Sequence, residues 1–162
     1  MKPILYTTAF LAGTTAALAS MDINEIDVSV ALDDIENAAA ISVWKSVETD
    51  LEAAIALRLV NQIADTGADI SVNLDEVALA SAFPTATGMA QAELSGRVTV
   101  MTERNVMTEN YRLTVLARDV VARDLRGSAV VPVSNDRIYA AMIAGFADNV
   151  ADRVKKRQPP AK

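Results

Sequence analysis

Four stretches of this chain alternate apolar and polar residues with a period of two, which is typical of β-strands that bury one face. We predict strands over 26–32, 70–74, 92–101 and 111–118. Their apolar sides consist of Ile26, Val28, Val30 and Leu32, then Ile70, Val72 and Leu74, then Ala92, Leu94, Gly96, Val98 and Val100, and finally Tyr111, Leu113, Val115 and Ala117. The opposite side of each stretch is mostly polar, so we expect it to face solvent.

The alternation slips or stops at several points. Val77 and Leu79 have the opposite parity to strand 70–74, which predicts a β-bulge at Asp75 and Glu76. Val120 and Val121 are expected to extend the last strand after a similar slip. Loops or turns rich in small, polar, Gly or Pro residues are predicted over 81–90, 104–110 and 126–128.

A first helix is predicted over 49–65. The apolar residues that recur there at helical spacing are Leu51, Ala54, Ile55, Leu59 and Ile63. Thr49 and Glu52 match a capping box, and Gly67 is a suitable residue just past the end of the helix. Residues 34–48 stay open between an early helix and a short extended piece.

A second helix is predicted from a cap at Ser134 or Asn135 to Val154. Its buried stripe is expected to contain Ile138, Met142 or Ile143, Phe146, Val150 and Val154. We predict that Ile55 and Leu59 of the first helix and Phe146 of the second are fully buried against the sheet.

The resulting order is β-α-β-β-β-α. Short connections between the last three strands favour an antiparallel meander, and two one-sided helices can cover its apolar face. We therefore predict an α+β two-layer sandwich, with a mainly antiparallel four-stranded sheet and two helices on one face. Residues 20–154 are expected to form this single domain, and 155–162 a disordered basic tail.

The first 19 residues have the composition of a secretory signal peptide. Lys2 precedes an apolar run over 4–12, and the small-residue motif 17–19 (Ala-Leu-Ala) comes before Ser20. Threonines and a glycine interrupt the run, and acidic residues follow closely, which argues against a membrane anchor. We expect cleavage after Ala19 and a periplasmic protein.

The charge of the chain is unevenly distributed. Residues 20–152 contain nine basic and 21 acidic residues, a net charge of −12, whereas five basic residues lie within 153–162. Such an acidic body repels phosphate backbones, so nucleic-acid binding is not expected. The basic tail, Arg153, Lys155, Lys156, Arg157 and Lys162, is expected either to be solvated or to make weak contact with anionic lipid head groups.

Cysteine and histidine are both absent, which excludes disulfides, the usual zinc sites and Ser-His-Asp or Cys-His catalysis. Asp33, Asp34 and Glu36 group three carboxylates but lack the spacing of a calcium loop, so a strand end followed by a helix cap explains them better. With 21 acidic residues, some pair of carboxylates will meet the spacing of a glycosidase by chance, and the sequence cannot select one. We predict no catalytic, cofactor-binding or metal-binding residue, and no cofactor.

Seven further residues were considered for catalysis or binding, and structural explanations are favoured for all of them. Ser128 and Ser134 lack a nucleophile elbow, and Gly96 lacks a phosphate-binding glycine run. Met89, Met101 and Met107 could offer thioethers to Cu(I), but their spacing favours packing. We expect Trp44 to pack over the sheet edge, with an exposed partner contact as the alternative.

The strand 26–32, the helix 49–65, the three later strands and the helix 135–154, placed after an export signal, resemble small envelope proteins of Gram-negative bacteria. The similar groups are the lipopolysaccharide-assembly lipoproteins and the auxiliary lipoproteins of envelope transporters. Those proteins are tethered through a lipidated N-terminal cysteine, which this chain lacks. The resemblance therefore implies an envelope location, argues against a membrane-fixed role, and assigns no functional residue.

Three functions remain open. The leading hypothesis is an exported, non-enzymatic accessory or interaction protein of the bacterial cell envelope, which offers a sheet edge or a polar sheet face to an envelope protein. The alternative is a small-molecule or lipid-binding periplasmic module with a cavity between helices and sheet. A hydrolase that uses only carboxylates ranks third.

Overall fold

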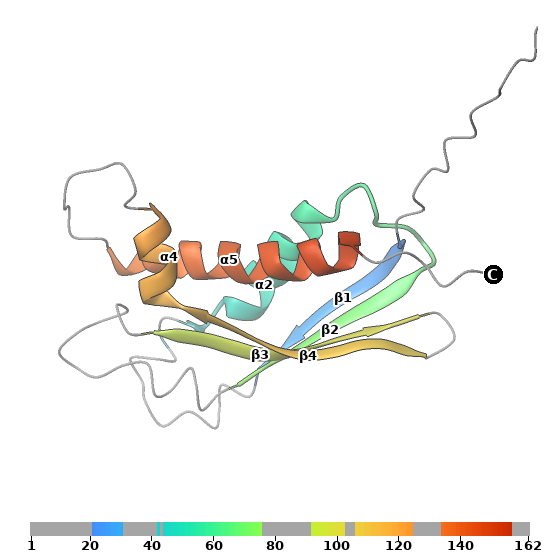
Figure 1. The fold of residues 1–162 in the computed structure, drawn as a ribbon, viewed down its shortest axis with the longest axis horizontal. Coiled ribbons are helices and arrows are strands. Elements are labelled where there is room, and N and C mark those ends of the chain that lie inside the picture. The colour runs from blue at the N-terminus through green and yellow to red at the C-terminus, as the bar shows by residue number, and fades with distance from the viewer. Residues whose placement is uncertain are drawn as a thin grey trace, which may run out of the picture.

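The computed structural model describes residues 21–30, 42, 44–75, 92–102, 106–124 and 134–156. In chain order these ranges form β1 (Ile23–Ser29), α2 (Val47–Arg58), β2 (Ala68–Leu74), β3 (Glu93–Met101), β4 (Met107–Leu116), α4 (Ala117–Asp124) and α5 (Asn135–Lys156). The helices lie together on one face of a twisted sheet (Figure 1). The predicted α+β two-layer sandwich is confirmed.

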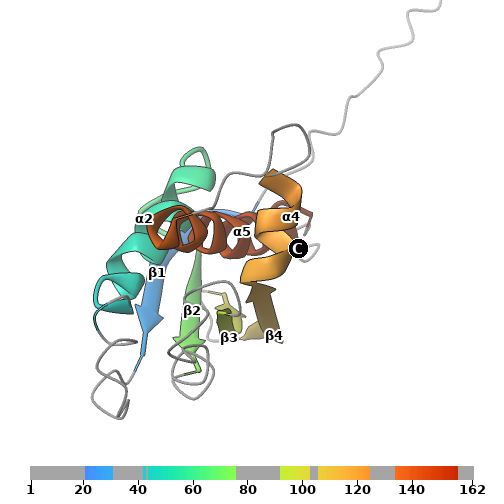
Figure 2. The ribbon, with the colours of Figure 1, turned by 90° about the vertical axis from the view of Figure 1, so that its left-hand side faces the viewer.

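The four strands form one mixed sheet in the order β1-β2-β3-β4. β1 and β2 are parallel because α2 carries the chain back between them, whereas β2, β3 and β4 form the predicted antiparallel meander. Viewed along the sheet, α2 lies beside β1, α5 lies over the middle strands, and α4 lies near β4 (Figure 2). This arrangement leaves the other face of the sheet outside the helix layer.

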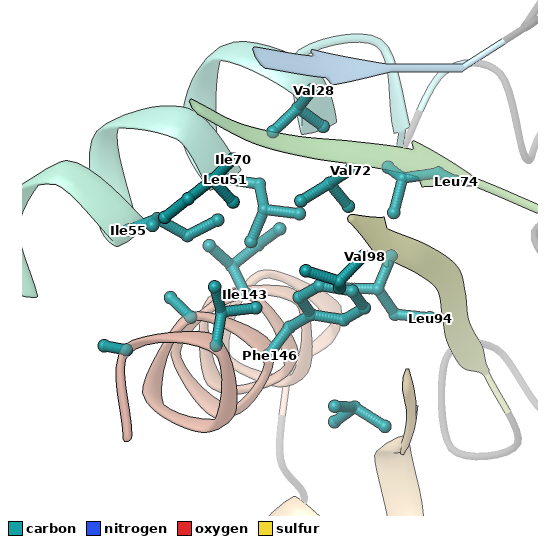
Figure 3. Close-up of a cluster of buried hydrophobic side chains, with 14 of the residues drawn as sticks. Val28, Leu51, Ile55, Ile70, Val72, Leu74, Leu94, Val98, Ile143 and Phe146 are labelled. Carbon is teal, nitrogen blue, oxygen red and sulfur yellow. The ribbon is translucent and has the colours of Figure 1, made fainter. Parts of the chain in front are cut away.

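The core fills the space between the helices and the sheet. Ile55, Leu59 and Phe146 are buried as predicted, and Phe146 points from α5 toward Leu94 and Val98 of β3 (Figure 3). The predicted stripe of α5 is also confirmed, with Met142 and Ile143 both buried. Ala68, Ile70, Val72 and Leu74 of β2 face the same core, as do the alternate residues from Ala92 to Val100 around β3. These side chains form one hydrophobic core between the two layers.

The predicted bounds of the first helix were wrong at both ends. α2 starts at Val47 after Ser46, and no side-chain hydrogen bond caps it, so Thr49 and Glu52 do not form a capping box. The helix ends at Arg58 because the next residues turn toward β1. The Ile23 amide donates to the Gln62 carbonyl at 2.7 Å, and the Ala64 amide donates to the Ile23 carbonyl at 2.9 Å. Residues 62–64 therefore extend the sheet at the start of β1.

Gly67 serves close packing and not the end of a helix. A Cβ atom at this position would overlap the backbone carbonyl of Asp22, which accepts a hydrogen bond from the Ala68 amide at 2.8 Å. The contact joins the chain entering β1 to the chain entering β2. Glycine is therefore needed for the approach of two backbones.

The strand bounds also differ from those predicted. β1 begins three residues early, at Ile23, and ends at Ser29. β4 begins at Met107, inside the segment expected to turn. The predicted extension through Val120 is instead the helix α4, whose Val120 packs near Gly145 of α5. A buried Val120 fits the pattern of a strand and also that of a helix. The contact with α5 is what distinguishes the two.

Ser134 caps α5 as predicted, since its hydroxyl accepts a hydrogen bond from the Arg137 amide at 3.4 Å. The helix continues to Lys156, so the first two residues assigned to the disordered tail are helical. Several predicted features lie outside the described residues: the signal peptide over 1–19, the segment 31–41, the bulge beyond Asp75, the loop 81–90, the turn 126–128 and the tail beyond Lys156.

The free edge of β1 is covered by two carboxylates from α2. The Glu52 side chain accepts a hydrogen bond from the Val28 amide at 3.1 Å, and Glu48 accepts one from the Val30 amide at 2.8 Å. These amides face away from β2 and would otherwise be available to an added strand. Along this part of β1, a partner strand would first have to displace both glutamates.

We expect Glu52→Ala to lower the free energy of unfolding by about 1–2 kcal/mol, because it leaves the part-buried Val28 amide without its acceptor. Glu52→Gln keeps an acceptor oxygen and is expected to lose less. Urea unfolding of both variants measures the difference. Equal midpoints for Glu52→Ala and the unaltered protein would contradict this function of the carboxylate.

Candidate functional site

The sheet face opposite the helices is polar across all four strands. Its residues alternate with the core-facing positions and are brought side by side by the strand register. They include Asp27, Ser29, Asp69, Ser71, Asn73, Ser95, Arg97, Thr99, Asn110, Arg112 and Thr114. Within the described residues, the helices lie on the opposite face of the sheet (Figure 2), so these polar side chains stand outside the helix layer.

Two arginines lie directly opposite each other on this face. Arg97 of β3 pairs in register with Arg112 of β4, beside a hollow of about 270 Å³. The residues that line the hollow are Asn73, Leu74, Asp75, Gly96, Arg97 and Arg112. We call this feature the arginine cleft.

Neighbouring polar groups orient both arginines. Arg97 donates to the Asn110 side chain at 3.1 Å, and Arg112 donates to the Ser95 hydroxyl at 3.2 Å. Arg112 also forms an ion pair with Asp75. The sequence interpretation of Asp75 as part of a polar bulge did not include this contact with a basic side chain two strands away.

The charges in the arginine cleft favour an anion. Like charges directly opposite on neighbouring strands destabilise a sheet, and Asp75 forms an ion pair with one of these two guanidinium groups, that of Arg112. Guanidinium groups match the geometry of carboxylates and phosphates, which can accept two parallel hydrogen bonds. The arginine cleft can thus hold one anionic group, whereas the body of the protein around it is acidic.

Gly96 lines the arginine cleft and lies within β3, not in a phosphate-binding loop. A Cβ atom on Gly96 would lie 3.0 Å from the Asn73 carbonyl oxygen and 3.0 Å from the Leu74 side chain. A larger residue would therefore press on β2 beside the hollow.

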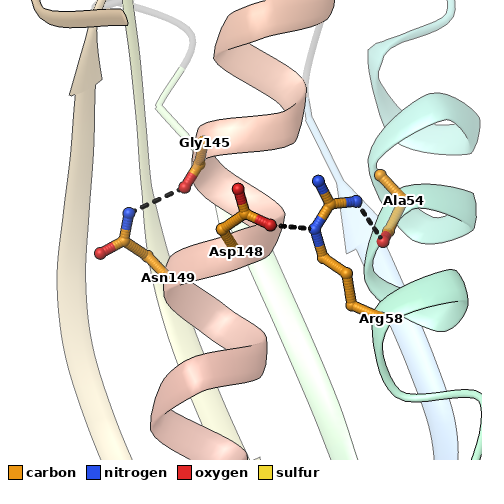
Figure 4. A network of polar contacts seen from close by, with 5 residues as sticks. All are labelled: Ala54, Arg58, Gly145, Asp148 and Asn149. Atoms are coloured by element: carbon orange, nitrogen blue, oxygen red, sulfur yellow. Dashed lines mark hydrogen bonds and ion pairs between the residues drawn. The ribbon is translucent and has the colours of Figure 1, made fainter. Parts of the chain in front are cut away.

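A second hollow, of about 350 Å³, lies between α2 and α5. Small residues, including Ala54, Ala140 and Ala144, form much of its wall. Arg58 of α2 forms an ion pair with Asp148 of α5 and also donates to the Ala54 carbonyl at 2.9 Å (Figure 4). These contacts join the two helices on their solvent side.

Tyr139 connects the same two helices farther along. Its hydroxyl donates to the Asp50 carboxylate at 2.7 Å, and Asp50 also accepts from the Ser46 hydroxyl at 2.9 Å. Burial, followed by the hydrogen bond to Asp50, holds the pKa of Tyr139 well above its usual range. Tyr139 is therefore protonated at neutral pH and acts as a hydrogen-bond donor.

Tyr111 has a comparable environment between β4 and α5. Burial and the Glu109 carboxylate raise the pKa of Tyr111 to about 12, although the Arg153 guanidinium, 4.0 Å from the ring centre, opposes the shift. Neither of these tyrosines is poised to act as a base or an ionised nucleophile near neutral pH.

Three of the remaining candidates, Trp44, Met101 and Met107, lie within the described residues. Trp44 is buried, as expected from packing, and its ring centre lies 5.6 Å from that of Tyr139. Met101 and Met107 are opposite each other in register, and the Met107 side chain is largely exposed. The candidates outside the described residues are Asp33, Asp34, Glu36, Glu76, Met89 and Ser128.

Among the residues that the structure describes, no group of three or more acidic side chains is arranged to hold a metal ion. None of the helices there combines the length and the apolar character that a membrane crossing requires.

Sequence reasoning did not identify the arginine cleft. Arg97 and Arg112 both stand on the predicted polar sides of strands, which places them on the same face of the sheet. Their direct pairing depends on the register across the hairpin, which includes an irregularity between Val100 and Met101. An assumed turn over 104–110 would have set a different register.

The chain was compared with protein families, curated sequences and solved structures, and only solved structures showed similarity. No protein-family model and no curated protein sequence matches it. One similar solved structure is a "putative lipoprotein from Caulobacter crescentus CB15", with 12% identity, a TM-score of 0.43, and coverage of 80% of this chain and 87% of that one. Another is an uncharacterized protein with 11% identity, a TM-score of 0.45, and coverage of 86% and 94%. Likeness at this level carries no argument about function.

Proposed function

We propose that this protein is an exported, non-enzymatic interaction protein of the bacterial cell envelope, and that the arginine cleft binds a carboxylate group of a partner protein. The observation that carries the proposal is the pairing of Arg97 and Arg112 on an open polar sheet face. The export signal in residues 1–19 supports the location.

The polar face suits a protein partner better than the sheet edge at β1 does. Glu48 and Glu52 already accept hydrogen bonds from two outward amides at the edge of β1, whereas the Arg97 side chain is exposed. An acidic partner surface would gain two charge-assisted contacts at one place. The acidic body would repel that surface elsewhere, which favours docking in one orientation.

A photoreactive amino acid in place of Thr99, one row from Arg97 on the same face, tests this proposal in cells that export the protein. We expect a discrete crosslinked product from position 99 and none from a matched probe at the exposed Ala53 on α2. Arg97→Glu should reduce the product by roughly tenfold, and Arg97→Lys should reduce it less because the charge remains.

Thermal unfolding of both Arg97 variants provides the control for folding. Because the Arg97 side chain is exposed, the unfolding midpoint should change little. The proposed site is wrong if position 99 yields no discrete product, or if Arg97→Glu leaves the product unchanged.

A further inference from the structure

The large hydrophobic side chains that are exposed in the described part of the chain gather at one end of the molecule. They are Leu57, Val60, Ile63, Val106 and Met107. The first three belong to the end of α2 and the turns after it, and the other two begin β4 after the hairpin (Figure 1). We call this set the apolar rim. The exposed fraction of these side chains ranges from 47% for Ile63 to 73% for Leu57, so they lie outside the core.

Strand register shows that the two parts of the apolar rim belong to the same end of the sheet. Pairs between neighbouring strands cross that end from one edge to the other: Ile63 with Ile23, Ile23 with Ala68, Asp69 (next to Ala68 in β2) with Met101, and Met101 with Met107. Four steps between neighbouring strands at about 4.8 Å each span about 19 Å. The apolar rim therefore borders one end of the sheet and is wider than a pocket for a single side chain.

The basic end of α5 lies at this same end of the molecule. β1 begins here, and α5 ends here with Lys155 and Lys156 (Figure 1). Arg157 and Lys162 follow in the sequence. Apolar side chains next to basic ones are the combination that binds the interface of an anionic bilayer.

Acidic residues nearby limit the electrostatic contribution. Asp22, Asp65 and Asp152 are exposed near the same end and oppose the basic residues of α5. The attraction between the tail and anionic head groups must therefore act over about one Debye length, 8–10 Å. Burial of the apolar rim has to supply most of the adhesion, and the basic residues supply the preference for anionic lipid.

We propose that the apolar rim rests on the surface of an anionic lipid bilayer, with the basic end of α5 against its head groups. Arg97 and Arg112 lie farther along β3 and β4 than Met101 and Met107, so a bilayer at this end would leave the arginine cleft accessible to a partner. The inference does not rest on the proposed carboxylate ligand. Each of the two surfaces can fail without the other.

Vesicle co-sedimentation of the exported form of the protein tests the inference. The vesicles contain phosphatidylethanolamine with phosphatidylglycerol, or phosphatidylcholine alone. We expect binding to the anionic vesicles that weakens as salt rises, and weaker binding to phosphatidylcholine. The double variant Leu57→Ser, Val60→Ser should lower affinity by about tenfold, because two side chains lose their burial in the interface.

A charge-matched pair of variants tests the orientation. Lys156→Glu should weaken binding to anionic vesicles several-fold, whereas Lys45→Glu, at the opposite end of α2, makes the same change in charge and should have little effect. Both lysines are exposed, so unchanged circular dichroism melting is expected.

Three results would overturn the inference. The first is no sedimentation with anionic vesicles at low salt, and the second is equal losses for Lys156→Glu and Lys45→Glu. The third is a change in oligomeric state without lipid in the Leu57→Ser, Val60→Ser variant, which would assign the apolar rim to a second copy of the chain. Crosslinking at Thr99 would be unaffected in each case.

Discussion

Truncation of Phe146 to alanine should lower the free energy of unfolding by about 3–5 kcal/mol. Phe146 is fully buried and stands at the centre of the core, where α5 faces β3 (Figure 3). Its removal would take away the largest fully buried side chain of α5 and leave a cavity between two layers held by other buried residues. The backbone of a sheet and a long helix cannot move inward freely to fill it.

Equilibrium unfolding in urea, followed by circular dichroism, measures this loss. Leu57→Ala is the matched control, because it also shortens a helical hydrophobic residue but at a position that is 73% exposed. We expect it to change the free energy by no more than about 0.5 kcal/mol. Equal losses for Phe146→Ala and Leu57→Ala would contradict the assignment of Phe146 to the core.

Gly67→Ala should be the other strongly destabilising change, with a loss of about 2–3 kcal/mol from a single added methyl group. The new Cβ would overlap the Asp22 carbonyl and lie 2.9 Å from the Ile23 nitrogen. Both are backbone groups held by hydrogen bonds to Ala68 and Gln62, so neither can rotate away as a side chain would. The start of β1 would have to separate from the start of β2.

Gly145→Ala is the control for this substitution. Its Cβ would lie 3.3 Å from a methyl group of Val120, which is a side chain and can adjust. Alanine also favours a helix over glycine by about 1 kcal/mol, so Gly145→Ala should be close to neutral or stabilising. If thermal melting ranks Gly145→Ala below Gly67→Ala, the close approach at Gly67 is not the constraint that the structure indicates.

Gly67 also shows why part of the sequence interpretation failed. A glycine after a helical pattern fits a helix terminus, and that local interpretation placed the end of the helix near residue 65. The actual end at Arg58 depends on hydrogen bonds from residues 62–64 to β1, some 40 positions earlier in the chain. Local propensity contains no information about that partner.

The capping-box pattern failed for a related reason. Thr49 and Glu52 have the right spacing, but the Glu52 carboxylate is used by the Val28 amide at the edge of β1. A capping box and the contact with Val28 would each give the Glu52 carboxylate a backbone N–H donor. The contact with Val28 forms because α2 lies beside the edge strand β1. Likewise, Val120 fits a strand or a helix until α5 is in place to contact it.

Features with a local signal could be predicted from the sequence: the alternating faces of β2 and β3, the buried stripe of α5 with Phe146 at its centre, the Ser134 cap, and the α+β class that follows from their order. Burial on one face imposes a period of two or of 3.6 on neighbouring residues, so it is visible in their order along the chain. Four other features became visible in the folded protein alone: the end of α2, the helix α4, the pairing of Arg97 with Arg112, and the apolar rim at one end of the sheet. Each of these depends on register or contact between segments far apart in the chain, which no local periodicity records.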